Sequence, residues 1–209
     1  MVPLGRFIVL EGGEGCGKST QAELLAAHLG AELTREPGGT EIGERIRELL
    51  LDRELAPLDA RAELMLMLAA RAQHVSERIR PWLEAGRDVV CDRFSGSTLA
   101  YQGFGRRLPL AAVAAANDLG CDGLEPDLVV LLDLAPEVGA ARRDEPDDRF
   151  EKEDRAFFDR VAKGFRELAR ADPDHWVVVD AAGPVDEVAG RVRAGVMARL
   201  GIAGAGGVV

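Results

Sequence analysis

Residues 7–20 read FIVLEGGEGCGKST, and the predicted fold is built outward from them. Residues 7–10 are apolar and have strand character, and residues 21–29 have the pattern of an amphipathic helix. Between these elements, residues 12–19 match the motif G-x-x-x-x-G-K-S/T in the strand, loop and helix context that the motif requires. We therefore predict a phosphate-binding loop with the residues Gly12, Gly13, Glu14, Gly15, Cys16, Gly17, Lys18, Ser19 and Thr20.

The residue types of this loop suit a bound polyphosphate. Gly12 and Gly17 lack a Cβ atom, so the loop can adopt left-handed angles and direct its N–H groups at an anion. The helix that follows adds its positive dipole end. Lys18 would bring a mobile positive charge to the β- and γ-phosphates, and Ser19 would present its hydroxyl to Mg²⁺. The alternative is a glycine-rich turn that matches by chance, which the flanking strand and helix disfavour.

Composition limits the classes of protein and ligand. The 209 residues suit one α/β domain, and 26 Lys and Arg against 36 Asp and Glu give a net charge of −10. Such a surface repels nucleic acid, so we expect a small anionic ligand and no nucleic-acid partner. The three cysteines are odd in number and lack metal-like pairing, which indicates a reducing cytoplasm. No apolar run reaches the ~18 residues of a membrane span, and residues 1–6 are too short for a signal peptide, so we expect no membrane partner.

Short apolar runs alternate with longer helical patterns, which is typical of βαβ units. We predict an α/β fold, a five-stranded parallel sheet with helices on both faces, in a single domain of residues 1–209. A short lid is expected over about residues 142–152 and a frayed tail over residues 201–209. Further strands are predicted at residues 31–34, 88–92, 127–133 and 175–180, and further helices at residues 41–51 (capped by Thr40), 56–80, 95–102, 110–119, 136–142, 154–171 and 185–200.

The helix predicted at residues 56–80 is unusual because residues 64–70 are apolar on every side. Such a helix must be covered all round, either within the chain or by a second subunit. Arg71 follows this apolar run, and its charge would be costly without a partner, so we expect it to meet a ligand or a buried acid. Met67 lies one turn earlier on the same face, either as plain core or as the apolar wall of a base pocket.

Charged residues stand at the carboxyl ends of the predicted strands, the edge where open α/β sheets bind ligands. Asp92 is the preferred carboxylate for Mg²⁺, with Asp133 as its rival, because Arg93 follows Asp92 and no phosphate-binding charge follows Asp133. Arg35 and Arg93 are placed to bind a second phosphate group, since guanidinium groups match phosphate oxygens. The alternative for each arginine is a surface ion pair.

Sequence blocks spread along the chain carry a family resemblance. They are the phosphate loop with Glu14 inside it, TREPGGT (34–40), ARAQHV (70–75), DRF (92–94), STLAYQG (97–103) and DRFE (148–151). In this order, over about residues 6–199, they resemble thymidylate kinase of the bacterial type. The phosphate loop alone is shared by many kinases, but REPGGT together with DRF and AYQG is quite specific.

The resemblance implies a P-loop kinase fold and transfer of the ATP γ-phosphoryl group to dTMP, giving dTDP in dTTP biosynthesis. It also implies Mg²⁺ as cofactor and a homodimer built on the long helix at residues 56–80. The homodimer agrees with the apolar middle of that helix.

Residue roles in an acceptor site also follow from the resemblance. Arg35 and Arg93 would bind the dTMP phosphate, Arg71 the thymine carbonyl and Thr98 the ring N–H. Met67 is a departure, because the family commonly has a phenylalanine there that stacks on thymine. A methionine can still cover a ring face but flat stacking is lost, which opens affinity and base selectivity to change.

The sugar end of the acceptor site is implied in the same way. Glu14 would approach the 3′-hydroxyl, and Tyr101 and Gln102 would lie on the sugar side, with Ser97 also in the site. Tyr101 would disfavour a 2′-hydroxyl by its bulk.

The catalytic arginine is expected in the lid. The family places this arginine either in the phosphate loop or in the lid, and the loop position here is Gly15. Arg143 is our first choice and Arg149 the second, with Arg142 also available. The predicted catalytic residues are therefore Lys18, Arg93, Arg142, Arg143 and Arg149.

No general base is expected, because the attacking phosphate oxygen is already ionised at pH 7 and catalysis is mostly alignment and charge neutralisation. None of His28, His74 and His175 is therefore given a role in the reaction. His74 lies inside the block at residues 70–75 but has no assigned function.

Other functions remain as alternatives. Met67 keeps open another nucleotide or deoxynucleoside kinase, for example one acting on dCMP. A P-loop switch protein that binds GTP is disfavoured because the chain has no Asn-Lys-x-Asp. A plain ATP-binding regulatory module is disfavoured because Arg35, Arg71 and Arg93 imply a second site for an acceptor.

Overall fold

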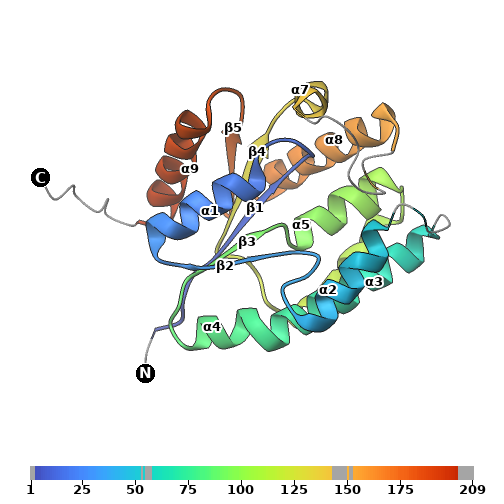
Figure 1. Cartoon of the computed structure of the whole chain (residues 1–209), viewed down its shortest axis with the longest axis horizontal. Helices are drawn as coiled ribbons and strands as arrows, with labels where there is room; N and C mark the ends of the chain where they lie inside the picture. The colour runs from blue at the N-terminus through green and yellow to red at the C-terminus, as the bar shows by residue number, and fades with distance from the viewer. Residues whose placement is uncertain (1–2, 53, 55–57, 143–149, 151–152, 202–209) are drawn as a thin grey trace, which may run out of the picture.

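The computed structural model describes residues 3–52, 54, 58–142, 150 and 153–201. Its sheet has five parallel strands in the order β2-β3-β1-β4-β5, which confirms the predicted fold class (Figure 1). Most of the predicted lid and tail, residues 143–149, 151–152 and 202–209, lies outside the described residues. The strands are β1 (Phe7–Gly12), β2 (Glu32–Arg35), β3 (Val89–Asp92), β4 (Leu128–Asp133) and β5 (Trp176–Asp180).

Helices follow the strands as expected, with small differences at their ends. Thr40 caps α2 as predicted, since its hydroxyl accepts from the Gly43 N–H. Asp154 precedes α8 instead of beginning it, because its carboxylate accepts from the Phe157 N–H as a cap. The helices are α1 (Lys18–Leu29), α2 (Glu41–Leu51), α3 (Ala60–His74), α4 (Arg80–Glu84), α5 (Ser95–Thr98), α6 (Leu110–Cys121), α7 (Pro136–Ala141), α8 (Arg155–Ala171) and α9 (Val185–Leu200), with π-helical turns η1 (Val75–Ile79) and η2 (Leu99–Gly105).

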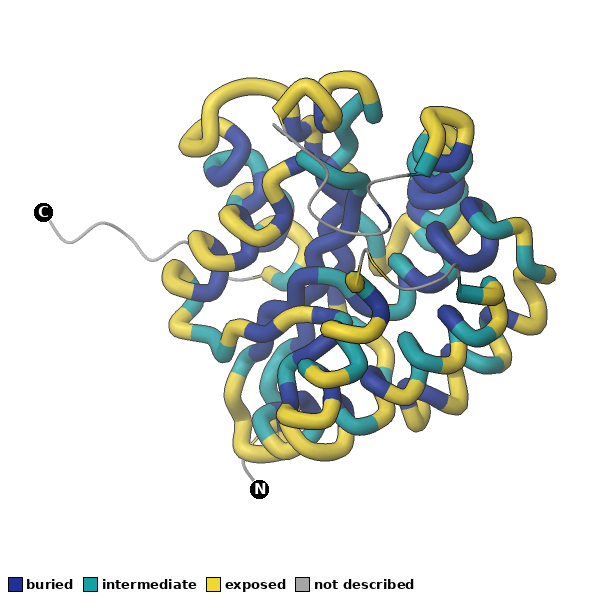
Figure 2. Tube along the Cα trace, turned by 45° about the vertical axis from the view of Figure 1, so that its right-hand side comes forward, coloured by how far each residue is buried: buried dark blue, intermediate teal, exposed yellow. Residues whose placement is uncertain are grey.

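The two faces of β1 show how the core is divided. Ile8 and Leu10 pack with α1 and α9, whereas Phe7 and Val9 pack with η1 and α4. Both faces of the central strands are thus covered, which is why these strands are apolar without alternation. Figure 2 shows the resulting band of buried chain through the middle of the molecule. This arrangement leaves the carboxyl ends of β1 and β3 as the edge on which a site can form.

The long helix differs from the prediction in extent and in burial. It begins at Ala60, where the Asp59 carboxylate accepts from the Arg61 N–H, and continues through η1 and α4 to Glu84. The side of α3 that carries Met65 is open, with Met65 68% exposed. The alternative that the rest of the same chain covers this helix on every side is therefore wrong. No helix in the described ranges is long and apolar enough to cross a membrane.

Candidate active site

The phosphate loop connects β1 directly to α1, so its backbone is held at both ends by the core. Gly17 has φ of 87° and Gly15 has φ of 70°, values that side chains rarely allow. A Cβ atom on Gly15 would also lie 2.2 Å from the Gly139 carbonyl oxygen. The Lys18 ammonium group donates to the Gly13 carbonyl, at 2.7 Å, so it lies folded over the loop. The open start of α1 and this ammonium group together suit a polyphosphate.

Asp92, at the end of β3, meets the phosphate loop. The Ser19 hydroxyl donates to Asp92 Oδ2 at 2.6 Å. Asp92 Oδ1 is buried and has no hydrogen-bond partner within the described part of the chain. A buried carboxylate oxygen without a partner is costly unless it binds a cation, so this pair fits Mg²⁺. The rival residue Asp133 instead forms an ion pair with Arg166 of α8, at 2.9 Å.

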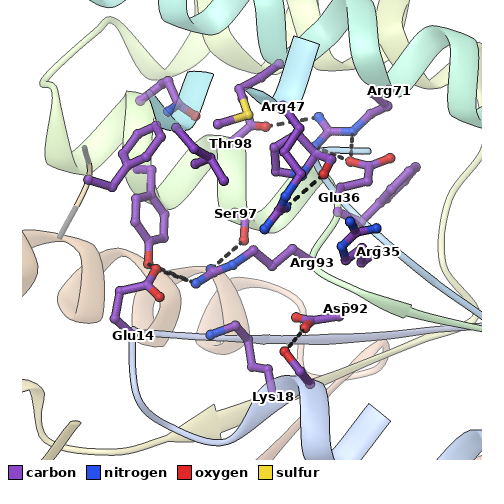
Figure 3. Close-up of a pocket in the computed structure, with 18 residues that line it drawn as sticks. Glu14, Lys18, Arg35, Glu36, Arg47, Arg71, Asp92, Arg93, Ser97 and Thr98 are labelled. Atoms are coloured by element: carbon purple, nitrogen blue, oxygen red, sulfur yellow. Dashed lines mark hydrogen bonds and ion pairs between the residues drawn. The ribbon is translucent and has the colours of Figure 1, made fainter. Parts of the chain in front are cut away.

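A cavity of about 290 Å³ opens beside this pair, between the phosphate loop, α2, α3 and α5 (Figure 3). Figure 3 shows Arg93 between Glu14 and Ser97, with Lys18 and Asp92 below it. Every acceptor residue predicted from the sequence lines this cavity, namely Glu14, Arg35, Met67, Arg71, Arg93, Ser97, Thr98, Tyr101 and Gln102.

Arg93 is a fixed cation at the mouth of the phosphate loop. Its backbone has φ of 73°, an unusual value for a residue with a side chain, and strain of this kind clusters at functional sites. Its guanidinium donates to the Gly12 carbonyl, to Ser97 Oγ and to Glu14 Oε1. Burial alone would lower the pKa of Arg93, but chiefly the Glu14 carboxylate raises it well above its ordinary value. Arg93 therefore stays charged at every working pH.

Arg93 and Tyr101 both donate to Glu14 in this cavity. Tyr101 donates its hydroxyl to Glu14 Oε1 at 2.5 Å, beside the Arg93 contact. Burial raises the pKa of Tyr101 well above its ordinary value, so the hydroxyl remains protonated and can donate. The Tyr101 ring is itself fixed by edge contacts with Phe150 and Phe157.

Arg71 meets the buried acid that its apolar surroundings require. Its side chain is 3% exposed, and its Nε and Nη2 contact Glu36 Oε2, both at 2.8 Å. Its Nη1 donates to Thr98 Oγ1 at 3.0 Å and to Asn117 Oδ1 at 2.6 Å. Burial would raise the pKa of Glu36, but Arg71 and His74 together lower it, so the carboxylate is ionised.

The position of Arg35 supports a phosphate contact less clearly than that of Arg93 does. It lines the cavity, but both of its terminal nitrogens donate to the Glu44 carboxylate, at 2.9 Å, in a half-exposed ion pair. The surface ion pair that was its alternative is therefore present. A phosphate would have to compete with Glu44 for this guanidinium group.

Polar residues of the site that the sequence did not reveal include Glu36, Arg47 and Asn117. Arg47 of α2 lines the cavity and donates to the Pro37 carbonyl at 2.9 Å. Helical spacing could have indicated that Arg47 faces inward, since it shares one face of α2 with the buried residues Gly43 and Leu50. Glu36 lies in the TREPGGT block directly after Arg35, but neither spacing nor pattern linked it to Arg71.

Of the three lid arginines, only Arg142 lies within the described residues. Arg142 donates to the Ala181 carbonyl at 3.3 Å and to the Gly15 carbonyl of the phosphate loop at 3.5 Å. Arg143 and Arg149, the two preferred catalytic residues, lie outside the described residues.

Comparison with known proteins shows the family of this chain. Residues 10–192 match the family model described as thymidylate kinase. A thymidylate kinase from Synechococcus sp. (strain JA-3-3Ab) is 51% identical over 199 residues, covering 93% of this chain and 96% of that protein. One from Desulfovibrio desulfuricans is 45% identical over 208 residues, covering 93% and 96%. The crystal structure of thymidylate kinase from Ehrlichia chaffeensis superposes with a TM-score of 0.76 at 33% identity, covering 92% of this chain and 98% of that chain. The chain therefore belongs to the thymidylate kinase family.

Proposed function

We propose that this protein transfers the γ-phosphoryl group of ATP to dTMP, giving dTDP, and that it does so with Mg²⁺ as a cytoplasmic homodimer. The observation that carries the proposal is the shared wall of the two sites: Lys18, Ser19 and Asp92 border both the phosphate loop and the arginine-lined cavity. A donor phosphate in the loop and an acceptor phosphate in the cavity would therefore face each other.

The chemistry asks the protein mainly to position two anions. The nucleophile is an oxygen of the acceptor phosphate, and Arg93, which lines the cavity, would supply positive charge beside it. Lys18 lies over the loop where the donor phosphates would bind. Ser19 and Asp92 would hold Mg²⁺, which when bound supplies positive charge to the phosphate oxygens. The chain is proposed to act as one domain with a lid over about residues 142–152.

The proposal is tested by supplying ATP, Mg²⁺ and one acceptor at a time in a coupled assay that follows ADP release. We expect dTMP to give the highest kcat/KM, above dCMP, purine nucleotides and thymidine. ATP should be preferred over GTP, and no activating partner should be needed. A protein that left dTMP unchanged, or that preferred dCMP or thymidine, would contradict the proposal and favour the alternative kinases.

Tyr101 gives a prediction about the sugar. We expect kcat/KM for UMP to be about tenfold to a hundredfold below that for dUMP, because a 2′-hydroxyl would overpack a ring that Phe150 and Phe157 hold in place. Steady-state kinetics with the two nucleotides measures the effect of the hydroxyl alone. Tyr101→Phe keeps the ring and should keep the discrimination. Equal kcat/KM for UMP and dUMP would show that Tyr101 does not exclude ribose.

The open side of α3 gives a prediction about assembly. Met65 is 68% exposed on α3 and Leu119 is 85% exposed on α6, close to where Gly120 packs against Leu68. We expect Leu119→Glu to weaken dimer formation about a hundredfold, because it places carboxylates in a dry interface. Sedimentation velocity over a concentration series measures the change. Leu4→Glu alters another exposed leucine elsewhere and should leave the dimer intact. A wild-type monomer at all concentrations would contradict the proposed assembly.

The proposed cytoplasmic location is supported by the state of the cysteines. Cys16, Cys91 and Cys121 are all free and buried, as expected for a protein kept in a reducing compartment. Fractionation of cells followed by immunodetection tests the cytoplasmic assignment.

A further inference from the structure

His74 lies where α3 ends and the π-helical turn η1 begins, and its side chain is completely buried. Its Nδ1 lies 3.1 Å from Glu36 Oε1, and its Nε2 lies 2.6 Å from Thr34 Oγ1. An ionised carboxylate can only accept a hydrogen bond, so Nδ1 must carry the hydrogen. In the neutral ring the Thr34 hydroxyl then donates to Nε2. Both ring nitrogens are therefore used, and the imidazole joins α3 to the end of β2.

The imidazole also supports the loop that follows β2. A Cβ atom on Gly39 would lie 2.4 Å from His74 Nε2, and Gly39 has φ of 80°. The loop backbone therefore runs directly against the ring, at a position where only glycine fits. A buried polar ring with two partners and this close neighbour can adopt few other orientations.

The two oxygens of the Glu36 carboxylate bind different residues. His74 donates to Oε1, and Arg71 contacts Oε2 through Nε and Nη2. The His74 contact thereby fixes the plane of the carboxylate, and the carboxylate fixes one edge of the Arg71 guanidinium. Figure 3 shows Glu36 beside Arg71 at the end of the cavity away from Lys18.

We propose that His74 is a positioning residue for the acceptor base: it holds Glu36 in the one orientation that keeps the Arg71 guanidinium facing the base end of the cavity. This inference rests on the proposed function. His74 touches neither nucleotide and has no part in proton transfer. Its loss leaves the charge of Arg71 and the phosphate end around Arg93 in place, so the effect falls on recognition of the base.

Base selectivity distinguishes this role from a structural one. Thymine presents a carbonyl oxygen at the position where cytosine presents an amino group, and arginine carries only donors. A fixed Arg71 favours the carbonyl and opposes the amino group, whereas a loose Arg71 can turn aside. Loss of positioning therefore lowers the ratio of kcat/KM for dTMP to that for dCMP. A purely structural defect would lower both values by one factor.

The test compares two variants of similar size. The amide nitrogen of His74→Asn falls near Nδ1 and can still donate to Glu36, while that of His74→Gln falls near Nε2 and reaches Thr34 instead. We expect His74→Gln to raise KM for dTMP about tenfold and to lower the dTMP-to-dCMP ratio about fivefold, with kcat and KM for ATP nearly unchanged. His74→Asn should stay within about threefold of wild type in each quantity. His28→Asn, on the exposed face of α1, is the matched control.

Calorimetric binding of dTMP and dCMP without ATP, with thermal unfolding of each variant, completes the experiment. The positioning role is overturned if His74→Asn and His74→Gln change kcat/KM for dTMP and for dCMP by the same factor. It is also overturned if neither variant changes the dTMP-to-dCMP ratio. If the wild type binds and phosphorylates dTMP but the His74 variants do not show the expected changes, only the inference about His74 is wrong. If the wild type binds no dTMP, both the inference and the proposed function are wrong.

Discussion

Replacing Arg143 by alanine should lower kcat about a thousandfold or more, with little change in KM for dTMP. An arginine that reaches the transferring phosphoryl group neutralises charge that develops only in the transition state, and such a residue is worth a factor of about 10³ to 10⁵. Gly15 stands at the loop position that carries this arginine in some members of the family, so we expect the lid to supply the guanidinium. Steady-state kinetics at saturating ATP and dTMP measures the effect on kcat.

Two other lid arginines serve as comparisons for Arg143. Arg149→Ala should be mild, and Arg142→Ala should mainly change KM for ATP, because Arg142 donates to carbonyls beside the phosphate loop. Arg170→Ala, at an exposed position on α8, should have no effect. A severe loss at Arg149 with a mild one at Arg143 would transfer the role to Arg149. Mild effects at all three positions would contradict a catalytic arginine in the lid.

Replacing Arg93 by methionine should lower kcat/KM for dTMP about a thousandfold. Methionine keeps much of the length but loses the buried charge and its fork of donors. Two charge-assisted hydrogen bonds to a phosphate are worth about 4 kcal/mol together, which corresponds to a factor of about 10³. Arg93→Lys keeps the charge without the fork and should fall between methionine and wild type. Initial rates at low dTMP concentration measure kcat/KM directly.

The Arg93 variant also affects Glu14, because Glu14 loses its ion pair with Arg93 at the same time. The double variant Arg93→Met with Glu14→Gln also removes the charge of the Glu14 side chain, and it should recover thermal stability without recovering activity. Recovery of activity in the double variant would show that Arg93 acts only by neutralising Glu14. A loss below about tenfold in Arg93→Met would contradict a phosphate contact at this position.

The part of the site that could be predicted from the sequence is the part whose residues are contiguous or end a strand. The phosphate loop is a local motif, so its residue types determine its conformation. Asp92 and Arg93 were predicted because parallel strands bring their carboxyl ends to one edge, and both line the cavity. Their proximity needed no knowledge of long-range packing.

The missed residues depend on contacts between distant segments. Arg71 clearly required a partner, but Glu36 is 35 residues away on an irregular loop, where no periodicity applies. Arg47 resembled an ordinary surface charge on α2 until the opposite wall of the cavity was known. The sequence assigned no role to His74, because its role depends on hydrogen bonds with Thr34 and Glu36, which lie in another part of the chain. Sequence patterns report which face is buried and not which side chains meet across it.

Asp92 and Arg93 are neighbours at the end of β3, yet their side chains have different partners: Asp92 accepts from Ser19, and Arg93 donates to Glu14 and Ser97. In the proposed reaction a single peptide unit would therefore set the spacing between the metal side and the acceptor side. Because both residues belong to one short segment of backbone, a displacement of this strand end would move both groups together and would change the distance between the two reactants little.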